Sequence, residues 1–201
     1  MKDNSERGGT PTPARRQQIL DVAAQMFVER GFRGTSIDDL GAAIGVTGPA
    51  LYRHFPAKEA LLAELLIGVS EDLVNGAKVR TSPSASDSSL SSLVDYHVDF
   101  ALDHPELITV QNRDLDCLSE IDQSRVRELQ RAYVELWVGA VIDANPGTDR
   151  ASARAGVHAA FGLMNSTPHS ARLGREQMHK LLTEMALAAF ASLDQWGDVR
   201  S

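Results

Sequence analysis

The chain is poor in the groups on which several functional classes depend. Its 201 residues contain a single cysteine, Cys117, which excludes an internal disulfide and fits a reducing cytoplasm. No apolar run approaches the roughly 18 residues that a membrane helix needs. The N-terminal stretch MKDNSERGGTPTP lacks the apolar region of a signal peptide. We therefore expect a cytoplasmic protein without a membrane partner.

Sequence motifs for catalysis are also missing. The chain has no phosphate-binding glycine loop, no G-x-G-x-x-G and no G-x-S-x-G elbow. Glu176 and His179 form one E-x-x-H pair, whereas di-iron bundles need two such pairs and two further glutamates. We therefore expect no enzyme, no cofactor and no metal site. A helical-bundle metal enzyme remains the less favoured alternative.

The strict alternation of a half-buried strand is absent, and apolar residues recur with the 3.6-residue period of a helix. The sequence therefore predicts an all-α protein. A serine-rich connection is expected over 80–92. The first expected helix begins at Thr12 or Pro13 and is ended by Gly31. Further helices are expected over 58–78, 93–103, a segment starting at Pro105, 120–144, 149–166 and 175–196.

The net charge of −7 is unevenly distributed. Residues 1–60 hold eight Lys and Arg against seven Asp and Glu, whereas residues 61–201 hold twelve against twenty. The acidic excess therefore lies outside the first 60 residues. An acidic body repels phosphate and would help to present only the N-terminal part to a nucleic acid.

The stretch 35–58, TSIDDLGAAIGVTGPALYRHFPAK, has the pattern of two short helices joined by a tight turn. We expect Thr35 to cap the first helix, with Asp38 three residues later. Gly45 supplies the positive φ that a helix exit commonly needs. Thr47 is expected to cap the second helix. This is the pattern of a helix-turn-helix unit, which places its second helix in the DNA major groove.

The polar and small residues around this unit are the candidate DNA contacts. Arg53 can make two hydrogen bonds to a guanine edge, and Tyr52 can donate to phosphate oxygens. The full predicted set is Arg33, Thr35, Ser36, Thr47, Gly48, Pro49, Tyr52, Arg53, His54 and Lys58.

Residues 14–65 resemble the DNA-binding domain of the tetracycline-repressor (TetR) family of bacterial regulators. The most specific match is L-Y-x-H-F-x-x-K-E, at 51–59. Pro49 and Ala50 depart from the family, many of whose members carry a polar or charged residue there. The other matching residues are Gly31, Phe32, Thr35, Ser36, Ile37, Leu40, Ala43, Gly45, Val46, Leu61 and Leu62.

The resemblance implies a domain organisation. We expect a disordered arm over 1–12 and a helix-turn-helix domain over 13–58. A linking helix over 57–78 then leads to a ligand-binding and dimerisation domain over 79–201. In the family, the linking helix moves when ligand binds and changes the separation of the paired recognition helices.

The last two expected helices, 149–166 and 175–196, differ from the others. The first is rich in Ala and Gly, and the second is apolar on most sides. A helix that is apolar nearly all round is buried on both faces. We therefore predict a two-fold homodimer through these helices, arranged as a four-helix bundle. A dimer also fits the near-palindromic operators that the family reads.

The resemblance further implies a pocket for a small, mostly apolar effector between about residues 90 and 170. Each candidate lining residue is equally well explained as part of the core. Arg113 hints at an anionic or thioester-carrying ligand. The candidates are His97, Phe100, Gln111, Arg113, Tyr133, Trp137, Phe161, Met164 and Asn165.

The predicted function is a DNA-binding transcriptional regulator, a repressor that a small effector releases from its operator. An activator, or a regulator without ligand, would have the same fold. The sequence names neither the effector nor the operator.

Overall fold

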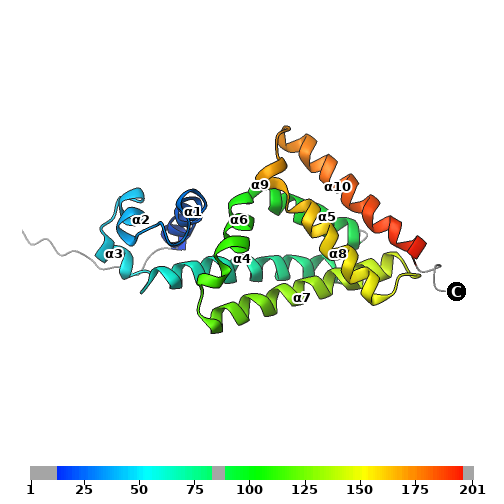
Figure 1. Ribbon diagram of the computed structural model, residues 1–201, viewed down its shortest axis with the longest axis horizontal. Coiled ribbons are helices and arrows are strands. Elements are labelled where there is room, and N and C mark those ends of the chain that lie inside the picture. Colours follow the sequence, from blue (N-terminus) through cyan, green and yellow to red (C-terminus); the bar gives the residue numbers. More distant parts are fainter. Residues whose placement is uncertain (1–12, 83–88, 197–201) are drawn as a thin grey trace, which may run out of the picture. The chain divides into compact units, whose positions relative to one another are not determined.

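The computed structural model describes residues 13–82 and 89–196, and all regular structure in these ranges is helical (Figure 1). The all-α prediction is therefore confirmed for the described residues. The predicted arm, 1–12, lies outside them. The α-helices are α1 (Pro13–Arg30), α2 (Ile37–Ala43), α3 (Gly48–Tyr52), α4 (Lys58–Arg80), α5 (Ser89–Asp103), α6 (Pro105–Asp114), α7 (Glu120–Ala144), α8 (Arg150–Met164), α9 (Thr167–Ser170) and α10 (Arg175–Ala191). Two 3₁₀-helices are η1 (Leu115–Cys117) and η2 (Ser192–Trp196).

The chain forms two compact units, 1–65 and 66–201. The boundary falls inside α4, so this one helix belongs to both units. No helix within the two described ranges is both long enough and apolar enough to cross a membrane.

The first unit is built from α1, α2, α3 and the start of α4 around a small apolar core. Phe27, Leu51 and Phe55 are almost completely buried in it. Gly31 and Gly45 have φ values of 77° and 71°, in the left-handed region where glycine carries no steric penalty. These two glycines end α1 and turn the chain between α2 and α3, as the sequence predicts.

The predicted cap of α2 is wrong by one residue. Ser36 is the N-cap, and its hydroxyl accepts a hydrogen bond of 3.1 Å from the backbone N–H of Asp39. The Asp39 carboxylate in turn accepts from the Ser36 N–H, which completes a capping box. Hydrogen bonds from the Ser36 hydroxyl and from its N–H lower the pKa of Asp39. Thr35 is buried instead, and its hydroxyl donates to the Gly31 carbonyl at 2.9 Å.

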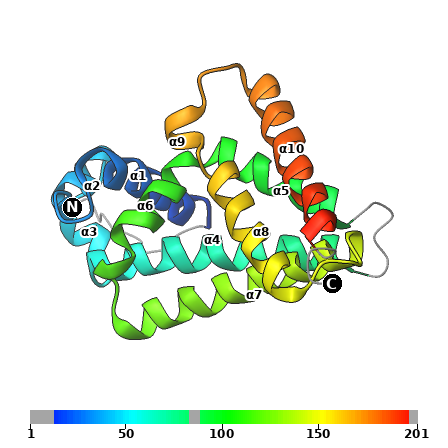
Figure 2. The same ribbon diagram turned by 45° about the vertical axis from the view of Figure 1, so that its right-hand side comes forward.

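The second unit is a bundle in which α8 packs against both α7 and α10, and α5 packs against α10 and α7 (Figures 1 and 2). Trp137 on α7 and Phe190 on α10 are fully buried, with ring centroids 5.9 Å apart. Small residues let the helices approach closely, because Ala153 and Ala160 on α8 and Ala186 on α10 are buried in the same core. The bundle surrounds the cavity described below.

Replacing Ser36 by alanine should lower the free energy of unfolding of the first unit by about 1 kcal/mol, because the capping hydrogen bond to Asp39 is lost. Thr47 is the matched control: it is the N-cap of α3 but makes no side-chain capping bond, so Thr47→Ala should cost much less. Urea unfolding followed by far-UV circular dichroism measures both. Equal losses in the two variants would contradict the assigned cap.

Candidate nucleic-acid interface and ligand cavity

The turn between α2 and α3 is held by backbone contacts. The Val46 N–H donates to the Gly41 carbonyl at 2.8 Å, and the Leu51 N–H donates to the Thr47 carbonyl at 3.1 Å. Thr47 is the N-cap of α3, and proline in its first turn costs no hydrogen bond. The arrangement is a helix, a tight turn and a second short helix.

Gly41 makes this turn possible, and sequence reasoning missed it. A Cβ atom added at Gly41 would lie 2.8 Å from the Val46 carbonyl oxygen and 3.2 Å from the Gly48 nitrogen. Both are backbone atoms and have no side-chain freedom with which to move away. Gly41 therefore sets how closely the turn and the start of α3 approach α2.

Several predicted contacts lie on the outside of this unit. Thr47, Pro49, Tyr52 and Arg53 are exposed on α3 and its cap, and Tyr52 is 52% exposed. A large aromatic side chain left this exposed is available to a partner. Arg33 and Ser36 are exposed on the turn that precedes α2.

Other members of the predicted set have their groups engaged inside the unit. The Lys58 ammonium donates to the Phe32 and Thr35 carbonyls, both at 2.7 Å, and lies 4.3 Å from the centroid of the Phe32 ring. Gly48 is buried, and a Cβ atom there would lie 2.1 Å from the Asp38 carboxylate. Lys58, Gly48 and the buried Thr35 hold the unit together, so we leave them out of the proposed contact set.

His54 has a mixed environment at the end of α3. Its backbone carbonyl accepts a 3.1 Å hydrogen bond from Arg16, whose guanidinium also pairs with Glu64 and lies 4.4 Å from the centroid of the Phe55 ring. The His54 Nδ1 atom is buried and has no partner among the described residues. The His54 backbone thus fastens α1 to the end of α3, and its ring is only partly exposed.

Gly41→Ala should destabilise the first unit by about 1–3 kcal/mol, because the added methyl group overpacks the turn. It should also weaken DNA binding, because α3 is displaced. Gly68→Ala on α4 is the matched control, since a Cβ atom at Gly68 meets no atom within 4 Å. Urea unfolding and gel-shift titration should leave the Gly68 variant close to wild type. DNA binding by the Gly41 variant at wild-type affinity would contradict this role.

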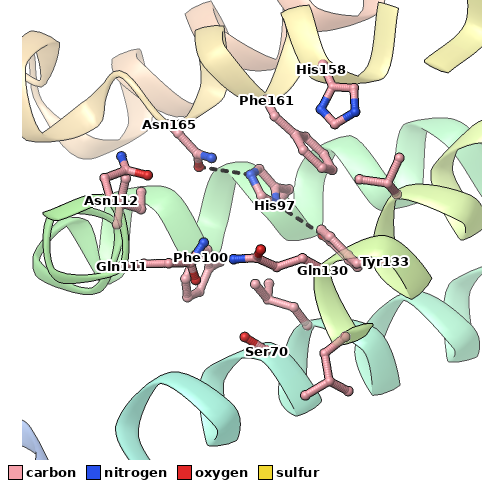
Figure 3. Close-up of a pocket in the computed structure, with 14 residues that line it drawn as sticks. Ser70, His97, Phe100, Gln111, Asn112, Gln130, Tyr133, His158, Phe161 and Asn165 are labelled. Carbon is pink, nitrogen blue, oxygen red and sulfur yellow. Dashed lines mark hydrogen bonds between the residues drawn. The ribbon is translucent and has the colours of Figure 1, made fainter. Parts of the chain in front are cut away.

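The second unit contains a cavity of about 260 Å³ between α4, α5, α6, α7 and α8 (Figure 3). In Figure 3, Ser70 from α4 lies on the opposite side from Phe161 and His158 of α8. The structure brings six of the predicted lining residues together around it: His97, Phe100, Gln111, Tyr133, Phe161 and Asn165.

His97 is the centre of the polar wall of this cavity. Its Nδ1 lies 3.0 Å from the Tyr133 hydroxyl, and its Nε2 lies 3.0 Å from Asn165 Oδ1 (Figure 3). Because Oδ1 only accepts, Nε2 carries the proton and Nδ1 accepts from Tyr133. Burial lowers the pKa of His97 to about 4, although the hydrogen bond that Nε2 donates to Asn165 acts in the opposite direction and raises it. The imidazole is therefore neutral at physiological pH.

Aromatic rings fix the orientation of His97. The Phe161 ring stacks on His97 with centroids 4.8 Å apart and on Tyr133 with centroids 5.5 Å apart. Trp137 meets Phe161 edge-on at 5.1 Å. Burial also raises the pKa of Tyr133, so its hydroxyl stays protonated and continues to donate to His97. Each ring in this wall therefore packs against at least one other ring.

Three predicted lining residues do not reach the cavity. Trp137 and Met164 are fully buried in the core of the second unit. Arg113 donates from Nε and Nη2 to both carboxylate oxygens of Asp114, at 3.1 and 2.9 Å. The anionic or thioester ligand that Arg113 suggested therefore finds no support from this residue.

Sequence reasoning missed other lining residues. The polar residues among them lie on amphipathic helices. The sequence spacing does not show whether a polar residue of such a helix faces a cavity or solvent. The missed residues are Ser70, Leu73, Ile108, Leu129, Gln130, Val134 and His158, and Asn112 of the polar segment 111–114 lines the cavity as well.

The histidine of the E-x-x-H pair on α10 lies against a carboxylate of α5. The His179 Nε2 lies 3.4 Å from Asp99 on α5, beside the Arg175 pairs with Asp99 and Asp103. Within the described ranges, no group of three or more His, Cys, Asp and Glu side chains is placed to hold a metal ion.

His97 should make stability depend on pH. In the unfolded chain it binds a proton near pH 6.5, whereas in the folded protein it does so only near pH 4. Its contribution is complete above pH 6.5, and about 3 kcal/mol is lost as the pH falls to 4. His97→Gln should therefore flatten the wild-type fall in unfolding free energy across this window, as measured by urea unfolding at fixed pH values. The same slope in both proteins would contradict the assignment.

A surface of α8 and α10 remains apolar and exposed. Leu181 and Met185 on α10 are 42% and 47% exposed. The small residues Ala155 and Ala159 on α8 are exposed as well. Exposed apolar side chains of this size, grouped on two helices, are typical of a protein interface.

A helix-turn-helix unit with an exposed second helix, joined by a shared helix to a bundle that contains a cavity, defines a DNA-binding regulator with a ligand-binding domain. Comparison with known proteins agrees. A family model described as "Bacterial regulatory proteins, tetR family" matches residues 19–65. The HTH-type transcriptional repressor KstR2 of Rhodococcus jostii (strain RHA1) is 32% identical over 141 residues, which cover 65% of this chain and 69% of that protein.

The chain belongs to the TetR family of bacterial transcriptional regulators. Solved structures share its fold. A TetR-family regulator from Bordetella parapertussis 12822 has a TM-score of 0.78 at 21% identity, covering 90% of this chain and 98% of that one. AibR, solved in complex with isovaleryl coenzyme A and operator DNA, has a TM-score of 0.69 at 22% identity, covering 85% and 97%.

Proposed function

We propose that this protein is a cytoplasmic repressor that binds a near-palindromic operator as a homodimer and leaves it when a small effector occupies the cavity. The observation that carries the proposal is that α4 belongs to both units and also lines the cavity. Ser70 and Leu73 of α4 lie in the cavity wall, and the same helix begins in the DNA-binding unit at Lys58.

The DNA half of the proposal rests on the exposed face of α3. Arg53 is proposed to read a guanine edge, and Tyr52 to donate to a phosphate. Thr47 and Pro49 would approach the bases or sugars, and Ser36 and Arg33 the backbone. The nearly neutral first 60 residues are better suited to phosphate than the acidic remainder of the chain.

The dimer half rests on the exposed apolar residues of α8 and α10. A two-fold axis through these helices would pair the same surface of both protomers, so that Leu181 and Met185 become buried. Two recognition helices then read two half-sites, which is why a near-palindromic operator is expected. The predicted domains, 13–58, the linking helix 57–78 and 79–201, remain our proposal for how the chain divides its tasks.

Effector and operator would be coupled through α4. Each ligand favours a different position of this helix, so binding of one weakens binding of the other by the same factor. The repressor of R. jostii supports the direction of regulation, and AibR shows this fold solved with a small molecule and operator DNA together. An activator would use the same coupling between effector and operator, but its binding to DNA would increase transcription instead of blocking it.

Two rival functions make different predictions. A regulator without ligand has no use for the cavity of about 260 Å³, so this cavity disfavours it. A helical-bundle enzyme would retain iron or manganese after purification without added metal, and elemental analysis of the purified protein detects either. The proposed repressor carries neither.

Selection of bound fragments from a genomic DNA library would identify the operator. With that operator, Arg53→Ala should weaken binding about tenfold or more, because two hydrogen bonds to a base are lost. Tyr52→Phe should weaken it roughly two- to tenfold, because one phosphate hydrogen bond is lost. Gel-shift titration measures both, and affinity should fall steeply with added salt.

Arg131→Ala is the matched control for Arg53→Ala, since Arg131 is an exposed arginine of α7 in the other unit. It should bind the operator like wild type. Wild-type affinity in both Arg53→Ala and Tyr52→Phe would show that α3 does not make the proposed contacts.

A further inference from the structure

None of the described Lys, Arg, Asp or Glu residues lies in the wall of the cavity. Its apolar surface comes from Phe100, Phe161 and aliphatic side chains, and its polar surface from amides, hydroxyls and two histidines. A carboxylate or phosphate buried there would lose its hydration without gaining an opposite charge, which is strongly unfavourable.

Arg113, the charged residue that follows two lining residues of α6, is already paired. The Arg113 guanidinium, next to the lining residues Gln111 and Asn112, is bound to the Asp114 carboxylate through two nitrogens. Turning it towards a ligand would leave a carboxylate that is only 5% exposed without this partner. His97 supplies no charge either, because burial holds its pKa near 4.

The two hydrogen bonds of His97 fix which groups of the polar wall donate and which accept. The Tyr133 hydroxyl donates to Nδ1, and Nε2 donates to Asn165 Oδ1. The acceptor oxygen of Asn165 is therefore used, whereas its Nδ2 group makes no hydrogen bond within the described part of the chain. Two N–H donors of Asn165 therefore remain for a ligand acceptor in the cavity that Phe161 also lines.

We infer that the cavity selects an uncharged carbonyl compound, whose oxygen accepts a hydrogen bond from Asn165 Nδ2 and whose apolar body lies against Phe161 and Phe100. This inference rests on the proposed role of the cavity as the effector site and adds the chemical class of the effector. The carbonyl belongs either to a free ketone or ester or to the acyl group of a thioester whose charged carrier stays outside the cavity.

The test uses four probes with one ring system, measured by isothermal titration calorimetry on the DNA-free protein. They are 2-acetylnaphthalene, 2-naphthoate, 2-ethylnaphthalene and 2-naphthoyl-coenzyme A. We expect the ketone to bind at least tenfold more tightly than the carboxylate and the hydrocarbon. A thioester that binds more tightly than the ketone would identify the acyl carrier as the source of the carbonyl, and a weaker one would identify the free compound.

Asn165→Leu provides the residue-level test, because leucine keeps the size of the side chain and removes its donors. The ketone should lose its advantage over 2-ethylnaphthalene, while the affinity for the hydrocarbon stays within twofold of wild type. Asn75→Leu, the same change at an exposed position of α4, should leave both affinities unchanged. The unchanged hydrocarbon affinity shows that the Asn165 variant is folded.

Three results would overturn the inference. They are a carboxylate that binds as tightly as the ketone, no binding of either carbonyl compound, and an Asn165→Leu variant that keeps the advantage of the ketone. Gel-shift assays with the operator are run separately. A ketone that binds but does not release the operator would refute effector release and leave the ligand class standing, whereas a protein that binds no operator would refute the repressor and not the ligand class.

Discussion

A single helix, α4, contributes buried side chains to the hydrophobic cores of both units. Leu61 and Leu62 near the start of α4 are fully buried within the first unit, and Val74 and Ala77 near its end are buried in the core of the second. Because interiors are tightly packed, the helix cannot shift in one unit without a response in the packing around it. The same helix therefore supplies residues to the wall of the cavity and to the core of the first unit.

Much of the local structure of the first unit could be predicted from the sequence. The positive φ at Gly31 and Gly45, the proline in the first turn of α3 and the burial of Leu51 and Phe55 all follow from local rules. Local rules failed where two segments distant in sequence meet. Nothing in the spacing shows that Lys58 folds back onto the Phe32 carbonyl. Nor did Gly41 stand out, because its importance comes from the approach of the Val46 backbone and not from its own conformation.

The cap of α2 is a different kind of error. Thr35 and Ser36 are both good caps followed three residues later by an acid, so the sequence allows two registers. Burial decides between them, because Thr35 is needed inside to donate to the Gly31 carbonyl. Similarly, α7 was predicted from Glu120 to Ala144 and found with those bounds, whereas the four-residue α9 is too short to show a helical period.

The cavity shows where prediction from the sequence ends. The family resemblance implied a ligand site with candidate aromatic residues on α5, α7 and α8, but only the fold separates Phe161, which lines the cavity, from Trp137, which packs behind it. The lining residues Ser70 on α4 and Gln130 on α7 could be recognised only when the helices were placed in three dimensions. The central claim is that ligand in this cavity and operator on α3 oppose each other. The most direct measurement is the operator dissociation constant, by fluorescence anisotropy, with and without a saturating cavity ligand. We predict an increase of about fivefold or more, and an unchanged constant would contradict the account.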